Sequence, residues 1–407
     1  MRVYRGLLTS AGVASIVAAA PLYAQVTSQS GQAESTADSS KGGLQDIVVT
    51  AQRRAENTQK VPIAIDTVSG EALMKRNIVD PTQLTQLVPS AQIGQSAGAY
   101  PVFFLRGGGS FSTNSFNDSA VVVSLDGVPM ARQYNINGQF FDLTRVEVLE
   151  GPQGTLYGRN ATGGAINLIP QRPGHTFRFD GVLSVGNYGA VITHAAADVP
   201  LNSALAARLS FHSSNHKGYT SDGLSDDDTQ AGRVQLAYDG GGPVTALLSG
   251  DIVHQGGKGA GFVLVDHGYE ADQRVGLTDP RAIPVYTSLG LAPIPAGSLT
   301  QNNRYEGTKL EVNWKSDLGT LTVLPAYRHA DVSFKSAYGG GENDNETDNQ
   351  ESVEVRFASN DRGALRWIVG GFYLRDQAKA CHVNRLPQQF GRLGSLQFDH
   401  RLESGLC

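Results

Sequence analysis

The C-terminal half of the chain alternates apolar and polar residues, and this alternation constrains the fold more than any other feature. It recurs in 205–212, 233–239, 308–315 and 353–357. In the third stretch Leu310, Val312 and Trp314 fall on one face, and Lys309 and Glu311 fall on the other. A period of two is that of a β-strand, whose successive side chains point to opposite sides. The pattern predicts strands with an apolar outer face and a polar inner face, as a membrane barrel requires. A soluble β-sandwich also alternates and stays open as an alternative.

Composition and charge exclude several other classes of fold and partner. The chain has 407 residues, of which 17% are charged and 48 are glycine. After the N-terminus the sequence offers no apolar run of about 18 residues for a membrane helix, so a membrane-embedded form must be a β-barrel. The net charge of −5 gives no electrostatic case for a nucleic-acid partner. Two cysteines exclude a disulfide-dense scaffold and a multi-cysteine zinc module.

The spacing of the strand candidates supports a membrane barrel. Nine candidates begin near residues 177, 190, 204, 232, 244, 305, 319, 351 and 365. Short turns are predicted at 200–204, 239–243, 316–319 and 360–364, and long connections at 213–231, 254–304, 336–350 and 379–407. Short turns on one side and long loops on the other are typical of outer-membrane barrels. The short hairpin at 187–189 is the exception, and a phase slip at 328–330 predicts a β-bulge.

The N-terminus has the form of an export signal. In residues 1–24, Arg2 and Arg5 precede an uncharged apolar stretch, and Ala24 offers a cleavage site. Such a segment predicts an oxidising, extracytoplasmic compartment. Residues 25–56 are predicted to be a flexible linker because their first part is rich in Ser, Gln and Gly.

A short segment within this linker favours an extended backbone. Residues 46–51 contain four consecutive β-branched residues, from Ile47 to Thr50. Such a segment can add itself as a strand to the sheet edge of another protein. It can equally be an ordinary edge strand of the domain that follows, and the residues alone leave both readings open.

Three motifs in the middle of the chain carry a family resemblance. They are Phe104–Gly109, Val121–Pro129 and Asp142–Asn167. Upstream of them, Val61–Ile65 is predicted to be a strand, and 70–77 and 80–88 are predicted to be short helices. From about residue 46 to residue 173 the sequence closely resembles the plug domain of TonB-dependent outer-membrane receptors.

The resemblance implies a fold and a function. The fold is mainly β, with a small mixed α/β plug at 57–172 inside a transmembrane antiparallel barrel. Residues 176–407 would supply about nine of the 22 strands of such a barrel, so we expect a fragment of a receptor or a truncated gene product. The family imports scarce nutrients such as ferric siderophores across the outer membrane of Gram-negative bacteria. The implied partners are TonB with its inner-membrane complex, membrane lipid and a small molecule such as a metal chelate. Neither a cofactor nor an enzymatic activity is implied.

Other functions remain as alternatives. The chain could be a non-functional truncated remnant or a secreted soluble β binding protein. A signalling receptor of the same family is disfavoured, because too few residues separate Ala24 from Asp46 for an extra domain. The sequence contains no Gly-x-Ser-x-Gly elbow, which argues against an α/β-hydrolase active site.

The resemblance also implies residues that bind TonB. The segment at 46–51 resembles the TonB box, the stretch of chain that TonB grips. The residues of this predicted TonB box are Asp46, Ile47, Val48, Val49, Thr50 and Ala51.

Two further sets of site residues follow from the resemblance. The residues expected to mediate contacts between plug and barrel are Arg106, Arg145, Glu147, Glu150 and Arg159. Family members often carry Arg or Lys at the position of Glu150, so the charge pairing there must differ. The residues expected to face a ligand at the plug apex are Ala97, Tyr100, Phe111 and Asn114.

Several further residues are weaker candidates. Cys381 and Cys407 are predicted to form a disulfide in an oxidising compartment. The acidic runs Asp226–Asp228 and Glu342–Asp348 fit no dedicated calcium loop and are predicted to be solvated charge outside the cell. No zinc-ligand pattern is present among the histidines. Some charged residues are expected to face the barrel lumen: Arg208, Arg233, Lys309 and Arg356.

Overall fold

A computed structural model describes most of the chain. The described residues are 48–50, 53–54, 56–96, 100–111, 118–261, 274–276, 278–288, 297–336, 342–360 and 365–384. The chain divides into residues 1–45 and residues 46–407, and all described residues belong to the second unit. The predicted signal peptide and the first part of the linker lie outside the described residues. Within the described part, no helix is long and apolar enough to cross a membrane.

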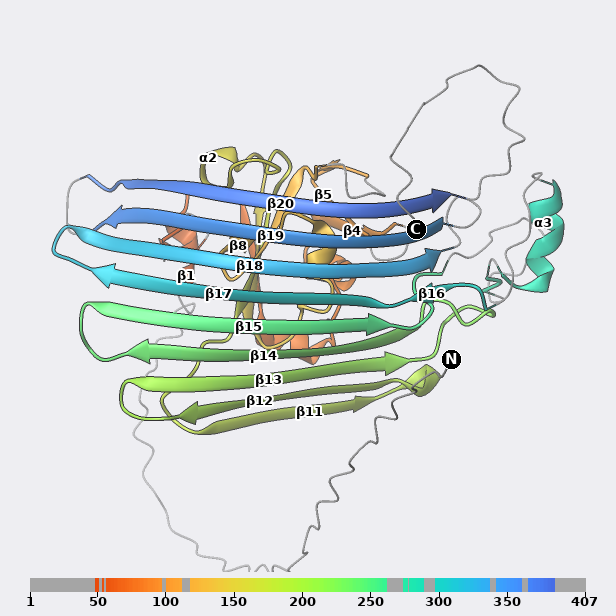
Figure 1. The fold of residues 1–407 in the computed structure, drawn as a ribbon, viewed down its shortest axis with the longest axis horizontal. Coiled ribbons are helices and arrows are strands. Elements are labelled where there is room, and N and C mark those ends of the chain that lie inside the picture. Colours follow the sequence, from red (N-terminus) through yellow and green to blue (C-terminus); the bar gives the residue numbers. More distant parts are fainter. Residues whose placement is uncertain are drawn as a thin grey trace, which may run out of the picture. The chain divides into compact units, whose positions relative to one another are not determined.

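The largest element is a ten-stranded antiparallel sheet, which we call the wall (Figure 1). Its main strands lie side by side in chain order: β11 (Arg178–Val185), β12 (Val191–Pro200), β13 (Leu205–His216), β14 (Asp227–Asp239), β15 (Val244–Gly256), β17 (Asn303–Lys315), β18 (Gly319–Ser336), β19 (Glu342–Ser359) and β20 (Ile368–Asn384). The short β16 (Thr300–Gln301) pairs with β18. The connections contain η4 (Asn187–Gly189), η5 (Pro280–Ala282) and α3 (Ile283–Ser288). The predicted strands are thus confirmed, although β14 and β19 begin earlier than expected.

The wall has the two faces that the alternation predicts. Outward side chains of its middle part are apolar and exposed, and they include Leu209, Phe211, Val234, Leu248, Ile252, Leu310 and Trp314. Inward side chains are polar and buried, among them Arg208, Arg233 and Lys309. An apolar exterior around a polar interior suits a sheet with lipid on one side and a wet lumen on the other.

The plug is a mixed α/β unit, as predicted. Its main sheet has the order β3 (Ile65–Ser69), β9 (Leu143–Glu150), β10 (Gly164–Pro170), β7 (Val121–Leu125) and β8 (Val128–Pro129). A second sheet contains β4 (Ala91–Gln95), β5 (Pro101–Leu105) and β6 (Gly108–Gly109), and a third contains β1 (Val48–Val49) and β2 (Glu56–Asn57). The helical segments are η1 (Thr58–Lys60), α1 (Gly70–Lys75), η2 (Pro81–Gln86), η3 (Gln133–Ile136) and α2 (Gly154–Tyr157). The strand predicted at 61–65 begins only at Ile65, and the helix predicted at 80–88 is the 3-10 segment η2.

The plug core is aliphatic and closely packed. Val146, Val148, Ile166 and Leu168 come from β9 and β10 and are almost fully buried. At the start of β10, Gly164 has a φ of 149°, and a Cβ there would collide with the backbone of β9. Glycine is therefore required at this position, because it has no Cβ and tolerates positive φ.

The bulge predicted at 328–330 is wrong. β18 keeps a constant register with both β17 and β19 through Arg328 and Ala330. The polarity of the two faces changes there instead. Inward Val332 and Phe334 pack in a buried cluster, while outward His329 carries a polar group. The apparent phase slip thus reflects contact with the plug on the inner face.

The long loop predicted at 336–350 is also wrong in most of its length. β18 ends at Ser336 and β19 begins at Glu342, so only residues 337–341 connect them. The acidic run 342–348 lies within β19, and Asp344, Glu346 and Asp348 are buried. A period of two places these three carboxylates on the inner face, so they are not solvated charge.

Candidate functional site at the junction of plug and wall

The described part of the predicted TonB box, 48–50, packs against the plug. β1 forms an antiparallel pair with β2, which lies just downstream in the chain. The side chain of Val49 is fully buried in a cluster that includes Leu149 and Tyr157. In this structure the segment is therefore docked rather than exposed.

The other three residues of the predicted box lie outside the described residues. They are Asp46, Ile47 and Ala51. The expectation of an extended backbone is therefore met at Val48 and Val49, which form β1, and it stays a prediction for Ile47. Binding of the box to TonB likewise stays a prediction for all six residues.

A buried charge pair holds the end of this segment. The backbone N–H of Thr50 donates to Glu147 Oε1 at 2.8 Å, and its hydroxyl lies 3.1 Å from the same oxygen. Arg145 Nε donates to that oxygen as well, at 2.8 Å. Glu147 is completely buried. A buried carboxylate is costly unless it is paired and hydrogen-bonded, so Thr50 and Arg145 satisfy Glu147 jointly.

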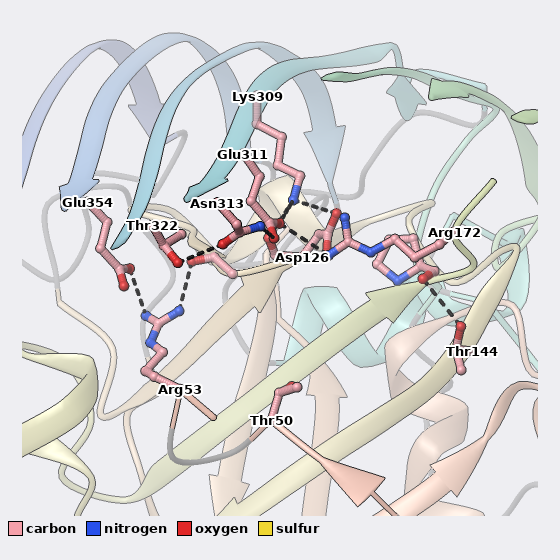
Figure 2. Close-up of polar contacts among 12 residues, drawn as sticks. Thr50, Arg53, Asp126, Thr144, Arg172, Lys309, Glu311, Asn313, Thr322 and Glu354 are labelled. Carbon is pink, nitrogen blue, oxygen red and sulfur yellow. Dashed lines mark hydrogen bonds and ion pairs between the residues drawn. The ribbon is translucent and has the colours of Figure 1, made fainter. Parts of the chain in front are cut away.

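Arg53 connects the segment to the wall (Figure 2). Its Nη1 donates to the carbonyl oxygen of Gly127 at 3.1 Å, and its Nη2 lies 3.5 Å from Glu354 on β19. Its guanidinium also lies over the ring of Tyr157, 5.0 Å from the centroid. Arg53 therefore contacts the plug and the wall at the same time.

Next to Arg53, a network of four charges joins the end of the plug to β17 (Figure 2). Lys309 Nζ lies 2.5 Å from Asp126 Oδ2 and 3.3 Å from Glu311 Oε2. Arg172 Nη2 lies 2.9 Å from Asp126 Oδ1 and 3.2 Å from Glu311 Oε2. Two cations and two carboxylates neutralise one another, so the plug is attached here without a net buried charge.

A second attachment lies at Asp142, just before β9. Arg208 on β13 donates to both oxygens of Asp142, at 2.8 and 2.6 Å, and to Asp198 at 2.8 Å. The hydroxyl of Ser210 also donates to Asp142. Burial alone would raise the pKa of Asp142, but the hydrogen bonds from Arg208 and Ser210 outweigh burial and lower it.

A third attachment joins the loop after η3 to the wall. The carboxamide of Gln139 accepts from Arg233 at 2.9 Å and donates to Asp251 at 2.8 Å. Arg328 Nη2 lies 2.9 Å from Asp251 Oδ2. Gln139 is fully buried, and both ends of its carboxamide are thus satisfied by wall residues.

A fourth attachment pairs plug tyrosines with wall carboxylates. The hydroxyl of Tyr100 lies 2.6 Å from Asp344 Oδ2 and 2.9 Å from Glu346 Oε2. The hydroxyl of Tyr134 donates to Glu346 Oε1 at 2.6 Å. Burial and the nearby carboxylates raise the pKa of both phenols, so they remain neutral donors. Close to them in the chain, Arg132 lies 2.6 Å from Asp376 on β20.

Among the residues expected to join plug and barrel, four make their described contacts inside the plug. Arg145 pairs with Glu147, and Arg106 pairs with Glu150. Arg159 is exposed on the plug surface. These pairs are internal because β9 lies in the middle of the plug sheet, between β3 and β10.

The residues that do reach the wall come mostly from loops between plug strands. Asp126 and Asp142 lie within the sequence motifs, but the motifs did not mark them as contacts to the wall. The residues that contact the wall include Arg53, Tyr100, Asp126, Arg132, Tyr134, Gln139, Asp142 and Arg172. On the wall side, the expected lumen-facing residues Arg208, Arg233 and Lys309 are among their partners. The sequence indicated these three residues because each lies on the polar, inward face of an alternating strand.

The residues expected at the plug apex divide into three groups. Tyr100 is buried against the wall, contrary to its expected ligand-facing position. Phe111 is 60% exposed and stays a candidate, whereas Ala97 and Asn114 lie outside the described residues.

Cys381 is disulfide-bonded, but Cys407 also lies outside the described residues, so their pairing stays a prediction.

A small mixed domain attached by polar contacts to the inner face of an antiparallel wall defines a plugged membrane β-protein. Comparison with known proteins identifies the plug: residues 57–165 match the TonB-dependent Receptor Plug Domain. The sequence is 33% identical over 134 residues to the pesticin receptor of Yersinia pestis, covering 32% of this chain and 20% of that protein. It is 32% identical over 130 residues to the iron-regulated outer membrane virulence protein of Vibrio cholerae, covering 31% of this chain and 20% of that protein.

Solved structures share the fold beyond the plug. The ferric yersiniabactin uptake receptor FyuA from Yersinia pestis superposes with a TM-score of 0.69 at 21% identity, over 80% of this chain and 50% of that one. The ferripyoverdine receptor of Pseudomonas aeruginosa gives a TM-score of 0.64 at 14% identity, over 84% and 46%. The chain thus spans about half the length of these structures. It belongs to the TonB-dependent outer-membrane receptors and comprises the plug and the N-terminal part of the barrel. Its location is the outer membrane of a Gram-negative bacterium.

Proposed function

We propose that this chain acts in the TonB-driven uptake of a scarce nutrient, with a metal chelate such as a ferric siderophore as its ligand. The observation that carries the proposal is the position of 48–50. This segment is docked on Glu147, and Arg53, just beyond it, contacts the wall at Glu354. A force applied to the segment would thus reach a buried plug contact and a contact with the wall.

The contacts around this segment suit a plug that must rearrange. The attachments to the wall are mainly hydrogen bonds and ion pairs, which water can replace at moderate cost. They stand beside a small buried cluster in which plug Tyr134 packs near Val332 and Phe334 of the wall. The aliphatic core of the plug cannot exchange with water in this way. Pulling would therefore separate polar contacts before it unfolds the core.

The ligand class rests on the relatives. The names of the first relatives and structures concern pesticin, iron regulation, yersiniabactin and pyoverdine. A vitamin B12 transporter from Vibrio vulnificus is also similar, at 29% identity over 131 residues. A metal chelate is accordingly the proposed class, and the particular compound is left to experiment.

Uptake of radioactive iron tests the proposal directly. The chain is expressed in a Gram-negative host that lacks its own siderophore receptors, with and without functional TonB, and a panel of ferric siderophores is supplied. We expect uptake of at least one chelate, and we expect both loss of TonB and the substitution Val49→Pro to abolish it. Val185→Pro, at the exposed end of β11, is the control for a proline outside the segment. A folded chain in the outer membrane without TonB-dependent uptake would support the alternative of a non-functional remnant.

A further inference from the structure

A cavity of about 220 Å³ lies between the plug and the inner face of the wall, beside the docked segment 48–50. Its lining includes Thr50 of this segment and inward residues of β17, β18 and β19. Arg54 also lines it and donates to Ser359 Oγ at 3.1 Å, where β19 ends, so the cavity lies towards the short turns of the wall. Sites for drug-sized molecules have volumes of about 300–1,000 Å³. This smaller cavity therefore has room only for a small ligand.

The lining of this cavity is rich in arginine. Its charged members among the described residues are four arginines and two carboxylates: Arg53, Arg54, Arg172, Arg356, Asp126 and Glu311. The two carboxylates already belong to the four-charge network described above, in which Arg172 and Lys309 neutralise them. Neutralisation of Arg53 and Arg356 must therefore come from outside the lining.

Arg53 and Arg356 share a single carboxylate, which lies outside the lining. Arg356 Nη1 lies 2.6 Å from Glu354 Oε1, and Arg53 Nη2 lies 3.5 Å from Glu354 Oε2. Within the described residues, neither arginine forms an ion pair with another carboxylate. The side chains of Arg53 and Arg356 are only 12% and 19% exposed. Two poorly solvated guanidinium groups thus face one carboxylate, which leaves one positive charge uncompensated.

One hydrogen-bond donor of Arg53 is also left over. Its Nη1 and Nη2 contact Gly127 and Glu354, but its buried Nε has no hydrogen-bond partner in the described part of the chain. The side chain of Arg53 points towards Glu354 on the wall (Figure 2). Buried polar groups are nearly always hydrogen-bonded. An unused donor and an uncompensated positive charge in the same place both indicate an anion.

We propose that this cavity binds a small tetrahedral oxyanion, phosphate or sulfate, between Arg53 and Arg356. A guanidinium group carries its donors in a rigid fork that matches the oxygens of such an anion. Chloride carries the charge but offers no pair of oxygens to this fork. The wall residues of the cavity point inward, away from the lipid-facing side, so a free oxyanion fits the site better than a lipid headgroup.

The bound oxyanion would also hold the segment 48–50 in its docked position. Arg53 lies three residues beyond this segment, and Arg356 belongs to β19. An anion between the two arginines therefore links the segment to the wall, in addition to the 3.5 Å ion pair of Arg53 with Glu354. Phosphate should accordingly slow undocking. This binding needs neither TonB nor uptake, so the inference goes beyond the proposed function.

Binding of inorganic phosphate to the full chain in dodecyl maltoside micelles, measured by isothermal titration calorimetry, tests the proposal. Sulfate is the second oxyanion, and chloride at the same ionic strength is the control for charge alone. Dihexanoyl phosphatidic acid is the probe for a lipid headgroup. We expect saturable binding of phosphate and sulfate, weakened about tenfold by Arg356→Gln through loss of a charged hydrogen bond.

Arg375→Gln is the matched control variant. Arg375 lies on the outward side of the neighbouring strand β20, and its side chain is 54% exposed, so binding should be unchanged. The proposal would be overturned by the absence of saturable oxyanion binding, or by chloride binding as tightly as phosphate. Binding of phosphatidic acid in place of both free oxyanions, or equal effects of the two arginine variants, would overturn it as well.

A second measurement covers the case in which Arg356→Gln fails to fold. The full chain carrying Val49→Cys is labelled with a thiol reagent in outer-membrane vesicles, and mass spectrometry reads the modification at position 49. At a phosphate concentration of about twice the dissociation constant, an anion that binds only the docked state should slow labelling about threefold relative to chloride.

Leu201→Cys, in an exposed wall turn, controls for any effect of phosphate on the reagent itself. Equal labelling of position 49 in phosphate and in chloride, at the same pH and ionic strength, would contradict the proposal. Both experiments omit TonB, so their failure is distinguishable from a failure of energised uptake.

Discussion

The interior of the plug and its junction with the wall are both buried, but they are built from different chemistry. In the interior, side chains such as Ile166 and Leu168 are aliphatic and almost fully buried. At the junction, Arg208, Lys309 and Tyr134 make hydrogen bonds and ion pairs with residues far away in the sequence. Apolar packing has no substitute in water, whereas polar groups can exchange partners with water. We infer from this difference that water can replace the polar contacts between plug and wall while the apolar core keeps the plug folded.

The largest effect is expected in the plug interior. Leu168→Ala removes a fully buried side chain from β10, and the free energy of unfolding of the plug should fall by about 2–5 kcal/mol. Pulse proteolysis of the full chain in urea measures this change. Leu201→Ala, in an exposed wall turn, is the control and should have little effect. Equal losses for the two variants would contradict an aliphatic core as the main source of plug stability.

A smaller effect is expected where the predicted TonB box is docked. Glu147→Gln keeps the shape of the side chain but leaves the guanidinium of Arg145 without its carboxylate. Docking of the segment should weaken by about 1–3 kcal/mol. Thiol modification of a Val49→Cys variant reports undocking, and Glu147→Gln should accelerate it roughly tenfold, since about 1.4 kcal/mol corresponds to a factor of ten. Glu71→Gln, at an exposed site on α1, should not change the rate of modification. A similar rate in the Val49→Cys protein alone and in its combinations with Glu147→Gln and with Glu71→Gln would refute the docked arrangement.

Acid should loosen the junction at Asp142 more than the core. Its pKa is lower in the folded protein than the usual value of about 3.9. Its stabilising contribution is therefore present above about pH 4 and is lost as the pH falls through the lowered value. We expect Asp142→Asn to be less stable than the natural chain at pH 7, with the two converging towards pH 2. Limited proteolysis across this range measures the difference, and parallel curves would show that Asp142 does not contribute in this way.

The smallest effect is expected at the partly exposed end of the junction. The side chain of Arg172 is 44% exposed, whereas that of Lys309 is 7% exposed. Arg172→Ala should cost at most about 1 kcal/mol, as is usual for exposed ion pairs. Lys309→Ala should cost more because it leaves Asp126 and Glu311 with one shared cation. Urea unfolding of both variants compares them, and a larger loss for Arg172→Ala would reverse this ranking.

Local patterns predicted much of the fold. The period of two located the strands of the wall, and the inward positions of Arg208, Arg233 and Lys309 followed from it. The resemblance of the plug motifs to a known family implied a mixed sheet, which is confirmed. These features depend on neighbours along the chain, so the sequence displays them directly.

Contacts across the junction could not be predicted in the same way. The run 342–348 was expected to be solvated because it is acidic, yet Tyr100 and Tyr134 cover its inward carboxylates. Arg145 and Glu147 were expected to reach the barrel, yet the register of β9 directs them to each other and to Thr50. More than 200 positions separate Tyr100 from Glu346, and no local pattern encodes such a pairing.

The sequence by itself thus determined the family, the two-faced strands and the mixed plug sheet, because each depends on local order and periodicity. Only the tertiary structure decided which charges pair and where 48–50 docks. The physical reason is that a charged side chain accepts any suitable partner within reach. The packing of plug against wall decides which partner is within reach.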